Sequence, residues 1–291
     1  MANPIWVASG TAGYGDELAR FFPLSRLGAF VTKTITIEPR PGHPPPRTAE
    51  VPFGMLNAIG LANVGTERFI TDKLPFLVRC GTPVVVNVAG RNIDEFARQA
   101  ERLGARPGIA MLELNLSCPN VKEGGTEFST DARLAERTVR AAVDKCPLPI
   151  VAKLSPNVTD IGEIARGAEA GGAAALSVMN TLQGLGINIW KRKPLLTFGM
   201  GGYSGPAVKP VALALVHKAS RAVPIPVIGI GGIATAEDVV EFLLAGASCV
   251  QVGTQTFVTP TTAPDLVDQL SLLLARLDVK SPSELVGKLD I

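Results

Sequence analysis

A short loop with one cysteine is the segment of this sequence best suited to acid–base chemistry. Cys118 follows an apolar run and stands directly before Pro119, between the amide side chains of Asn115 and Asn120. Proline fixes its own φ and biases the preceding residue toward an extended backbone, so the thiol is held beside amide donors and acceptors. We interpret Cys118 as a general base. The alternative is a buried structural thiol, which is our interpretation of Cys80, Cys146 and Cys249.

Two glycine-containing turns in the C-terminal third have the character of a phosphate site. Gly231 and Gly232 follow one apolar run, and Gly253 and Thr254 follow the next. Backbone N–H groups that no side chain shields can approach phosphate oxygens, helped by the positive end of a following helix. These turns predict a bound phosphate group. A tight turn needed only for packing is the alternative.

Lysines and neutral amides elsewhere indicate which phosphate-bearing ligand would fit. Lys33 and Lys153 each end an apolar run, as do several asparagines. A cation near the N1–C2 carbonyl edge of a flavin stabilises the negative charge that appears on reduction, and we assign this part to Lys153. Lys33 could serve both cofactor and substrate. Asparagine amides pair with a pyrimidine imide without adding charge, so we expect a flavin stacked against a small anionic heterocycle.

The elements that must position these residues form an alternating pattern of strands and helices. Short runs rich in Val, Ile, Leu and Ala are typical of parallel strands buried on both faces, at residues 29–34, 54–57, 84–88, 111–115, 150–154, 174–179, 227–230 and 249–252. Helices are expected at residues 66–78, 93–103, 131–144, 159–170, 206–221, 236–245 and 263–277. Residues 5–8 are interpreted as a floor strand or an N-terminal hairpin, and residues 38–52 as a proline-rich loop. The pattern predicts a (β/α)₈ TIM barrel that forms a single domain, residues 1–291.

Polar residues collect at the C-terminal ends of these expected strands, where such a barrel builds its active site. They are Lys33, Asn57, Asn87, Asn115, Lys153, and the pair Asn180 and Thr181. A single polar residue of this kind is often only a solvated strand end. Their convergence on one mouth favours a functional site.

Composition excludes several classes of function. The chain has 291 residues, a net charge of +2 and 46% apolar residues, with no basic stripe for nucleic acid. No run reaches the roughly 18 apolar residues of a membrane span. The N-terminal residues lack the pattern of a signal peptide, and the four cysteines form neither a disulfide framework nor a metal motif. We expect a soluble, cytoplasmic protein without a metal ion.

Seven segments together resemble one family over nearly the whole chain. The chain is similar to the class 1 dihydroorotate dehydrogenases, and most similar to the catalytic subunit of class 1B. The matching segments are residues 8–11, 31–34, 38–42, 54–61, 115–120, 152–157 and 231–233. Class 2 enzymes carry a serine at the position of Cys118 and an N-terminal extension, so we expect this chain to lie outside class 2. It departs from the usual pattern at residues 188–190 and at Val64.

The resemblance implies a set of ligand contacts. FMN would be bound by Ser9, Lys33, Thr34, Asn87, Asn115, Lys153, Met179, Gly205, Gly231, Gly232, Gly253 and Thr254. The substrate would contact Lys33, Asn57, Ala58, Ile59, Gly60, Leu61, Asn115, Asn120, Asn180 and Thr181. Cys118 falls at the position of the family's catalytic base.

The implied activity is the oxidation of dihydroorotate to orotate in pyrimidine synthesis, with a hydride passing from C6 to flavin N5. Class 1B enzymes pass electrons to a second subunit that carries FAD and an iron–sulfur cluster and reduces NAD, so we expect a homodimer within a heterotetramer. This chain has no cysteine cluster for iron. The alternatives are a class 1A fumarate-using enzyme, a dihydropyrimidine dehydrogenase-like reductase, and a noncatalytic flavin- or phosphate-binding barrel.

Overall fold

The centre of the structure is a closed barrel of eight parallel strands, seen in a computed structural model that describes residues 2–116, 122–123, 126–128 and 130–291. The order around the barrel is β1-β16-β15-β10-β9-β6-β5-β2. The strands are β1 (Ile5–Val7), β2 (Ala29–Val31), β5 (Val84–Val88), β6 (Ile109–Asn115), β9 (Ile150–Lys153), β10 (Ala175–Val178), β15 (Val227–Ile230) and β16 (Ala247–Val252). The predicted (β/α)₈ barrel is confirmed.

Two predicted strands are present, but the places predicted for them in the fold were wrong. Gly54–Asn57, predicted as the second barrel strand, forms β4 outside the barrel. The eight barrel strands include β1 instead. β1 was predicted as a floor strand or hairpin, but it pairs in parallel with both β16 and β2. The burial pattern explains the difference, because β1 is fully buried whereas three of the four residues of β4 are half-exposed. Parallel barrel strands are covered on both faces, as β1 is.

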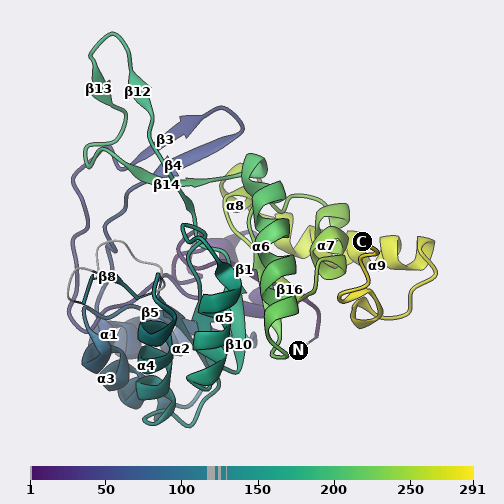
Figure 1. Cartoon of the computed structure of the whole chain (residues 1–291), viewed down its shortest axis with the longest axis horizontal. Helices are drawn as coiled ribbons and strands as arrows, with labels where there is room; N and C mark the ends of the chain where they lie inside the picture. Colours follow the sequence, from purple (N-terminus) through teal and green to yellow (C-terminus); the bar gives the residue numbers. More distant parts are fainter. Residues whose placement is uncertain (1, 117–121, 124–125, 129) are drawn as a thin grey trace.

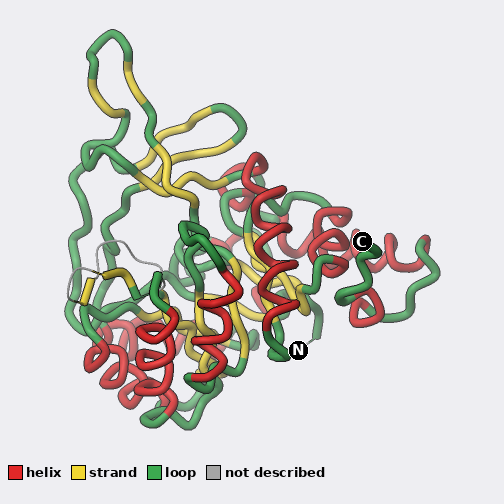
Figure 2. Tube along the Cα trace, viewed as in Figure 1, coloured by secondary structure: helices red, strands yellow, loops and turns green. Residues whose placement is uncertain are grey.

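Helices surround the barrel near most of the predicted positions (Figure 2). They are α1 (Thr66–Arg68), α2 (Leu74–Arg79), α3 (Ile93–Gly104), α4 (Ala132–Val143), α5 (Ile161–Ala170), α6 (Lys209–Ala222), α7 (Ala236–Leu244), α8 (Gln255–Val258) and α9 (Thr262–Arg276). One π-helical segment, Phe69–Lys73, separates α1 from α2 where the sequence predicted one continuous helix. Asp131 and Thr235 accept hydrogen bonds from N–H groups of the first turns of α4 and α7, which fixes where these helices begin.

Side-chain alternation along the strands divides the core into two parts. Outward-facing residues such as Val86 and Leu112 pack against the helices in the main hydrophobic cluster. Inward-facing residues Trp6, Val31, Val85, Val151 and Ile228 form a second cluster inside the barrel. Because side chains alternate with a period of two, the next inward position toward the C-terminal end of each strand lies above this apolar layer. These upper positions carry the polar residues of the barrel interior.

An antiparallel sheet lies over one end of the barrel. Its order is β11-β14-β4-β3, formed by β11 (Leu182–Gly184), β14 (Gly201–Ser204), β4 and β3 (Thr48–Val51). The predicted loop 38–52 thus contains a strand. Figure 1 shows the hairpin of β12 (Ile187–Asn188) and β13 (Lys193–Pro194) reaching out beyond this sheet. A two-stranded ribbon is formed by β7 (Lys122–Glu123) and β8 (Thr126–Glu127).

No helix in the described ranges is long and apolar enough to cross a membrane.

Candidate active site

Two adjoining chambers open at the C-terminal end of the barrel, between the strand ends and the antiparallel sheet. The first has a volume of about 350 Å³ and the second about 370 Å³. Both are lined by Ser9, Gly10, Lys33, Asn57, Ile59, Lys153, Asn180 and Thr181. The shared lining means that two ligands, one in each chamber, would lie in contact.

The first chamber is closed by the glycine turns after β15 and β16. Gly231, Gly232, Gly253 and Thr254 line it, and so does Gly205. In the described part of the chain, the N–H groups of Gly231 and Gly232 donate to no other protein group. Free N–H groups beside a cavity are the donors that a phosphate requires.

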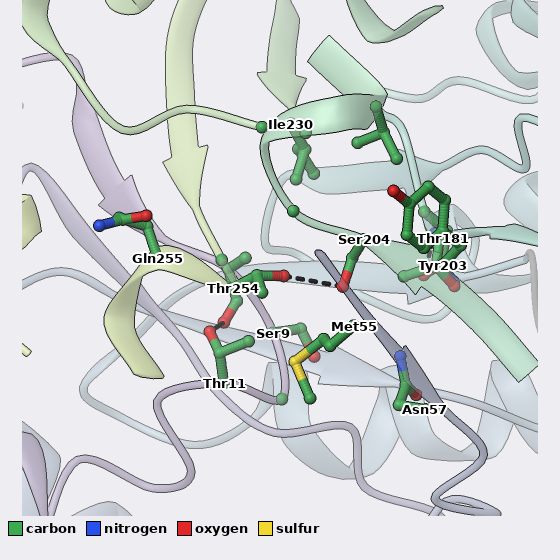
Figure 3. A pocket seen from close by; sticks show the side chains of 18 of the residues that line it. Ser9, Thr11, Met55, Asn57, Thr181, Tyr203, Ser204, Ile230, Thr254 and Gln255 are labelled. Atoms are coloured by element: carbon green, nitrogen blue, oxygen red, sulfur yellow. Dashed lines mark hydrogen bonds between the residues drawn. The ribbon is translucent and has the colours of Figure 1, made fainter. Parts of the chain in front are cut away.

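Gly232 is held in a backbone conformation that suits glycine. Its φ is +76°, and a Cβ there would lie 2.9 Å from the backbone nitrogen of Lys209. A side chain at this position would therefore strain the backbone and push the turn away from the first turn of α6. Figure 3 shows the first chamber, where Thr254 Oγ1 donates to Ser204 Oγ at 2.8 Å.

Two ammonium groups give the chambers a positive character. Lys33, which follows β2, is half-buried, whereas Lys153, the last residue of β9, is 5% exposed. Burial lowers the pKa of Lys33, and the Arg47 guanidinium lowers the pKa of Lys33 further. Among the described residues that line the two chambers, none is Asp or Glu. The pair of chambers is thus suited to anionic ligands.

Amides and hydroxyls form a continuous network across the second chamber. Asn180 Nδ2 donates to Asn115 Oδ1 at 3.5 Å, and Asn115 Nδ2 donates to Thr34 Oγ1 at 3.4 Å. Ser9 Oγ lies 3.3 Å from Thr34 Oγ1, and the Thr181 N–H donates to Asn180 Oδ1 at 2.8 Å. The network fixes the orientation of each amide. Oriented amides can read the donors and acceptors of a heterocycle.

The segment from Asn57 to Leu61, for which substrate contacts were predicted, lines the second chamber, and it enters from β4 and not from a barrel strand. Asn57 Nδ2 donates to the carbonyl of Gly202 at 3.2 Å, which ties β4 to β14. Ala58, Ile59, Gly60 and Leu61 complete this wall. The antiparallel sheet therefore brings Asn57 to the mouth that the strand ends define.

Most of the predicted site residues line these chambers, and among the described ones Asn87 does not. Asn87 is fully buried in β5 and is not among the lining residues, and its Nδ2 donates to Glu113, the residue opposite it on β6. Cys118 and Asn120 lie outside the described residues. Their predicted roles stay predictions.

Sequence reasoning missed several lining residues of the antiparallel sheet and its flanks. His43 stacks on Phe198, with ring centroids 3.9 Å apart and planes 9° from parallel, and both line the second chamber. Met55 and Tyr203 line the first chamber. Met55 and Tyr203 lie on β4 and β14, which pair although they are about 150 residues apart in sequence, and His43 and Phe198 lie in loops equally far apart, so no local pattern could have identified them.

The comparison with known protein families decides the family of this chain. The model of the dihydroorotate dehydrogenase family matches residues 1–274. The chain belongs to the dihydroorotate dehydrogenase family. Members of this family are oxidoreductases, as predicted from the sequence.

Curated relatives of this dihydroorotate dehydrogenase family member cover nearly its whole length. A protein of Pelobacter propionicus is 50% identical over 290 residues, which are 100% of this chain and 95% of the relative. A protein of Trichlorobacter lovleyi is also 50% identical over 290 residues, with the same coverage. One of Desulforudis audaxviator is 49% identical over 287 residues, 99% of this chain and 94% of the relative. All three are named dihydroorotate dehydrogenase B (NAD(+)), catalytic subunit, which confirms the class 1B resemblance.

Proposed function

We propose that this chain oxidises (S)-dihydroorotate to orotate in pyrimidine biosynthesis in the cytoplasm, with FMN as the resident cofactor. The observation that carries the proposal is the pair of adjoining chambers, which share Lys33 and Lys153. A phosphate-bearing flavin and a small carboxylate are both anionic. Two cations and a lining of neutral amides suit both ligands at once.

The residues of the first chamber fit the chemistry of FMN. The N–H groups of Gly231 and Gly232 would hold the phosphate together with Gly253 and Thr254. We propose further contacts to FMN from Ser9, Lys33, Thr34, Asn115, Met179 and Gly205. Asn87, which is buried beside Glu113, is also proposed as a contact. The bound flavin supplies a hydride acceptor next to the second chamber. Lys153, almost fully enclosed, would face the edge that becomes negative on reduction.

The second chamber is proposed to hold dihydroorotate. Lys33 would pair with the substrate carboxylate, since an ammonium group that has lost part of its water binds a carboxylate strongly. The amides of Asn57, Asn115 and Asn180, with Thr181 and the wall from Ala58 to Leu61, would pair with the ring carbonyl and N–H groups. Asn120 is proposed as a further contact on the basis of the sequence.

Cys118 is proposed as the general base. Oxidation of dihydroorotate removes a proton from C5 and a hydride from C6, and the thiolate would take the C5 proton. The proposal rests on the Cys-Pro sequence between two asparagines and on the resemblance of this loop to that of the family. Asn115, the last residue of β6, lies three residues before Cys118 in the sequence.

The electrons are proposed to leave through a partner. The relatives are named as catalytic subunits of an NAD(+)-linked enzyme, which supports a second subunit. We propose that this subunit carries FAD and a [2Fe–2S] cluster and reduces NAD, and that two copies of each chain form a heterotetramer around a homodimer of this one.

The experiment that tests the proposal is ligand binding to the purified protein. The protein should be isolated with FMN, and orotate should shift the visible spectrum of that FMN because the two ligands touch. Lys33→Met should weaken the orotate-induced shift while FMN stays bound. A protein that binds orotate with no change in the flavin spectrum would contradict the two-chamber arrangement.

A further inference from the structure

A buried carboxylate lies at the centre of the barrel, directly beneath the two chambers. Glu113, on β6, is 0% exposed. Its Oε1 accepts from Asn87 Nδ2 at 2.6 Å, and its Oε2 accepts from Ser177 Oγ at 2.6 Å and from Gln251 Nε2 at 2.8 Å. Every contact of the carboxyl group is with a donor, which is the environment of an ionised carboxylate.

The donors come from strands all around the barrel. Asn87 lies on β5, Ser177 on β10 and Gln251 on β16. In the ring of eight strands, β16 is four strands away from β6 in either direction, so the bond from Gln251 to Glu113 crosses the full width of the barrel. These side chains occupy the inward positions just above the apolar layer that contains Val85 and Val151. The network therefore forms the floor of the chambers.

Lys153, one of the two lysines that line both chambers, contacts this floor. Nζ of Lys153 lies 3.7 Å from Oε1 of Glu113, and the two side chains are 6% and 0% exposed. Lys153 makes no other ion pair among the described residues. A buried ammonium group without a counter-charge is strongly disfavoured, so the carboxylate accounts for the presence of a charged Lys153 at this depth.

We propose that Glu113 is a positioning residue that holds Lys153 in place and partly offsets the charge of Lys153 at the cofactor. The inference rests on the proposed FMN site. Because charges interact strongly in a buried environment, the carboxylate weakens the field that Lys153 exerts on the reduced flavin. Glu113 thus lowers the reduction potential of bound FMN below the value that Lys153 alone would produce.

Substitution of Glu113 by glutamine changes the charge and leaves room for every contact. The amide oxygen of the new side chain can still accept from Asn87 and Lys153. The new amide nitrogen would face Ser177 Oγ, which can accept, and Gln251, whose own Oε1 has no partner among the described residues. Rotation of the Gln251 amide would present that oxygen to the new donor. A matched control is Ser177→Ala, which removes one hydrogen bond to Glu113 without changing its charge.

The test is an anaerobic redox titration of the FMN-loaded protein. Glu113→Gln should increase the preference for reduced over oxidised FMN about tenfold or more, a rise in midpoint potential of about 30 mV for a two-electron couple. Ser177→Ala should stay close to the wild-type potential. An unchanged potential in FMN-loaded Glu113→Gln, or an equal shift in both variants, would overturn the inference while the FMN site stands. A wild-type protein that binds no FMN would overturn the proposed function and the inference with it.

Thermal unfolding of the protein without FMN provides a second readout. Lys153→Met leaves the carboxylate of Glu113 without its ion-pair partner and should lower the melting temperature. The double variant Glu113→Gln with Lys153→Met has a neutral floor and should regain much of that loss, even if Glu113→Gln alone folds poorly. A double variant that is no more stable than Lys153→Met would contradict the pairing.

Discussion

The hydroxyl of Thr254 donates to the hydroxyl of Ser204 at 2.8 Å, and this bond joins the end of barrel strand β16 to strand β14 of the overlying sheet. Thr254 belongs to a glycine turn that lines the first chamber, and Ser204 and Gly205 line the same chamber from the end of β14. The barrel end and the antiparallel sheet are thereby held as two walls of one cavity. These two walls would enclose the FMN proposed for this chamber.

Binding of orotate or dihydroorotate should weaken in alkaline solution because Lys33 loses its charge. The pKa of Lys33 lies below its ordinary value of 10.5, chiefly through burial. The cation is present below that lowered pKa and is lost as the pH rises through it, whereas the ligand carboxylate stays ionised. Equilibrium titrations of orotate at increasing pH measure this loss of affinity.

The matched variant for this prediction is Lys33→Met. It should bind orotate about 10- to 100-fold more weakly at neutral pH, the usual contribution of a charge-assisted hydrogen bond, and should lack the alkaline decline. If the orotate affinity of Lys33→Met declined equally at alkaline pH, a group other than Lys33 would be responsible for the decline.

Gly232→Ala should weaken FMN binding. The new Cβ would require a left-handed backbone and would lie 2.9 Å from the Lys209 nitrogen. Strain of this kind costs about 1–3 kcal/mol, and relief of the strain would displace the N–H groups proposed for the phosphate. The control is Gly287→Ala, with a similar φ of +69° and no heavy atom within 4 Å of the added Cβ. Flavin fluorescence titration measures both, and equal affinities would rule out a role for the Gly232 turn.

Cys118→Ser should slow reduction of the flavin by dihydroorotate roughly 10²- to 10⁴-fold, because serine is far harder to ionise than cysteine. In the wild type the rate should rise with pH as the thiolate forms. The control is Cys80→Ser, since burial raises the pKa of the Cys80 thiol. Stopped-flow absorbance under anaerobic conditions measures the rate, and near-normal reduction by Cys118→Ala would exclude a cysteine base.

Cys249 is expected to remain a thiol under these conditions. Burial raises the pKa of the Cys249 thiol to about 12. The unfolded chain ionises this thiol near pH 9.0, so the folded state loses stability between that pH and about 12. Thermal unfolding across this range should show a decline that Cys249→Ala reduces, and an identical decline in both proteins would contradict the assignment.

The sequence was sufficient for the barrel and for the residues at its strand ends, since both depend on local patterns. Buried parallel strands produce apolar runs, and glycines or polar residues follow them where the mouth lies. The same reasoning misplaced residues 54–57, because the partner of β4 is a strand about 150 residues away. It also passed over Glu113, which stands inside an apolar run. Its role depends on Gln251 from the opposite side of the barrel.

Electron transfer to NAD should require a second subunit. The isolated chain should be reduced by dihydroorotate and reoxidised by small artificial acceptors, with negligible NADH formation. Addition of a partner with FAD and an iron–sulfur cluster should restore NAD reduction. Steady NADH production by this chain alone would refute the requirement, and efficient turnover with fumarate would favour the class 1A alternative.

The most direct test of the account is a single anaerobic turnover of the purified chain. Dihydroorotate should bleach the visible absorbance of the bound flavin, and one equivalent of orotate should appear for each FMN reduced. That ratio is expected when each bound flavin takes one hydride from one substrate molecule. Flavin that stays oxidised, with no orotate formed, would contradict the account and would leave a noncatalytic flavin-binding barrel.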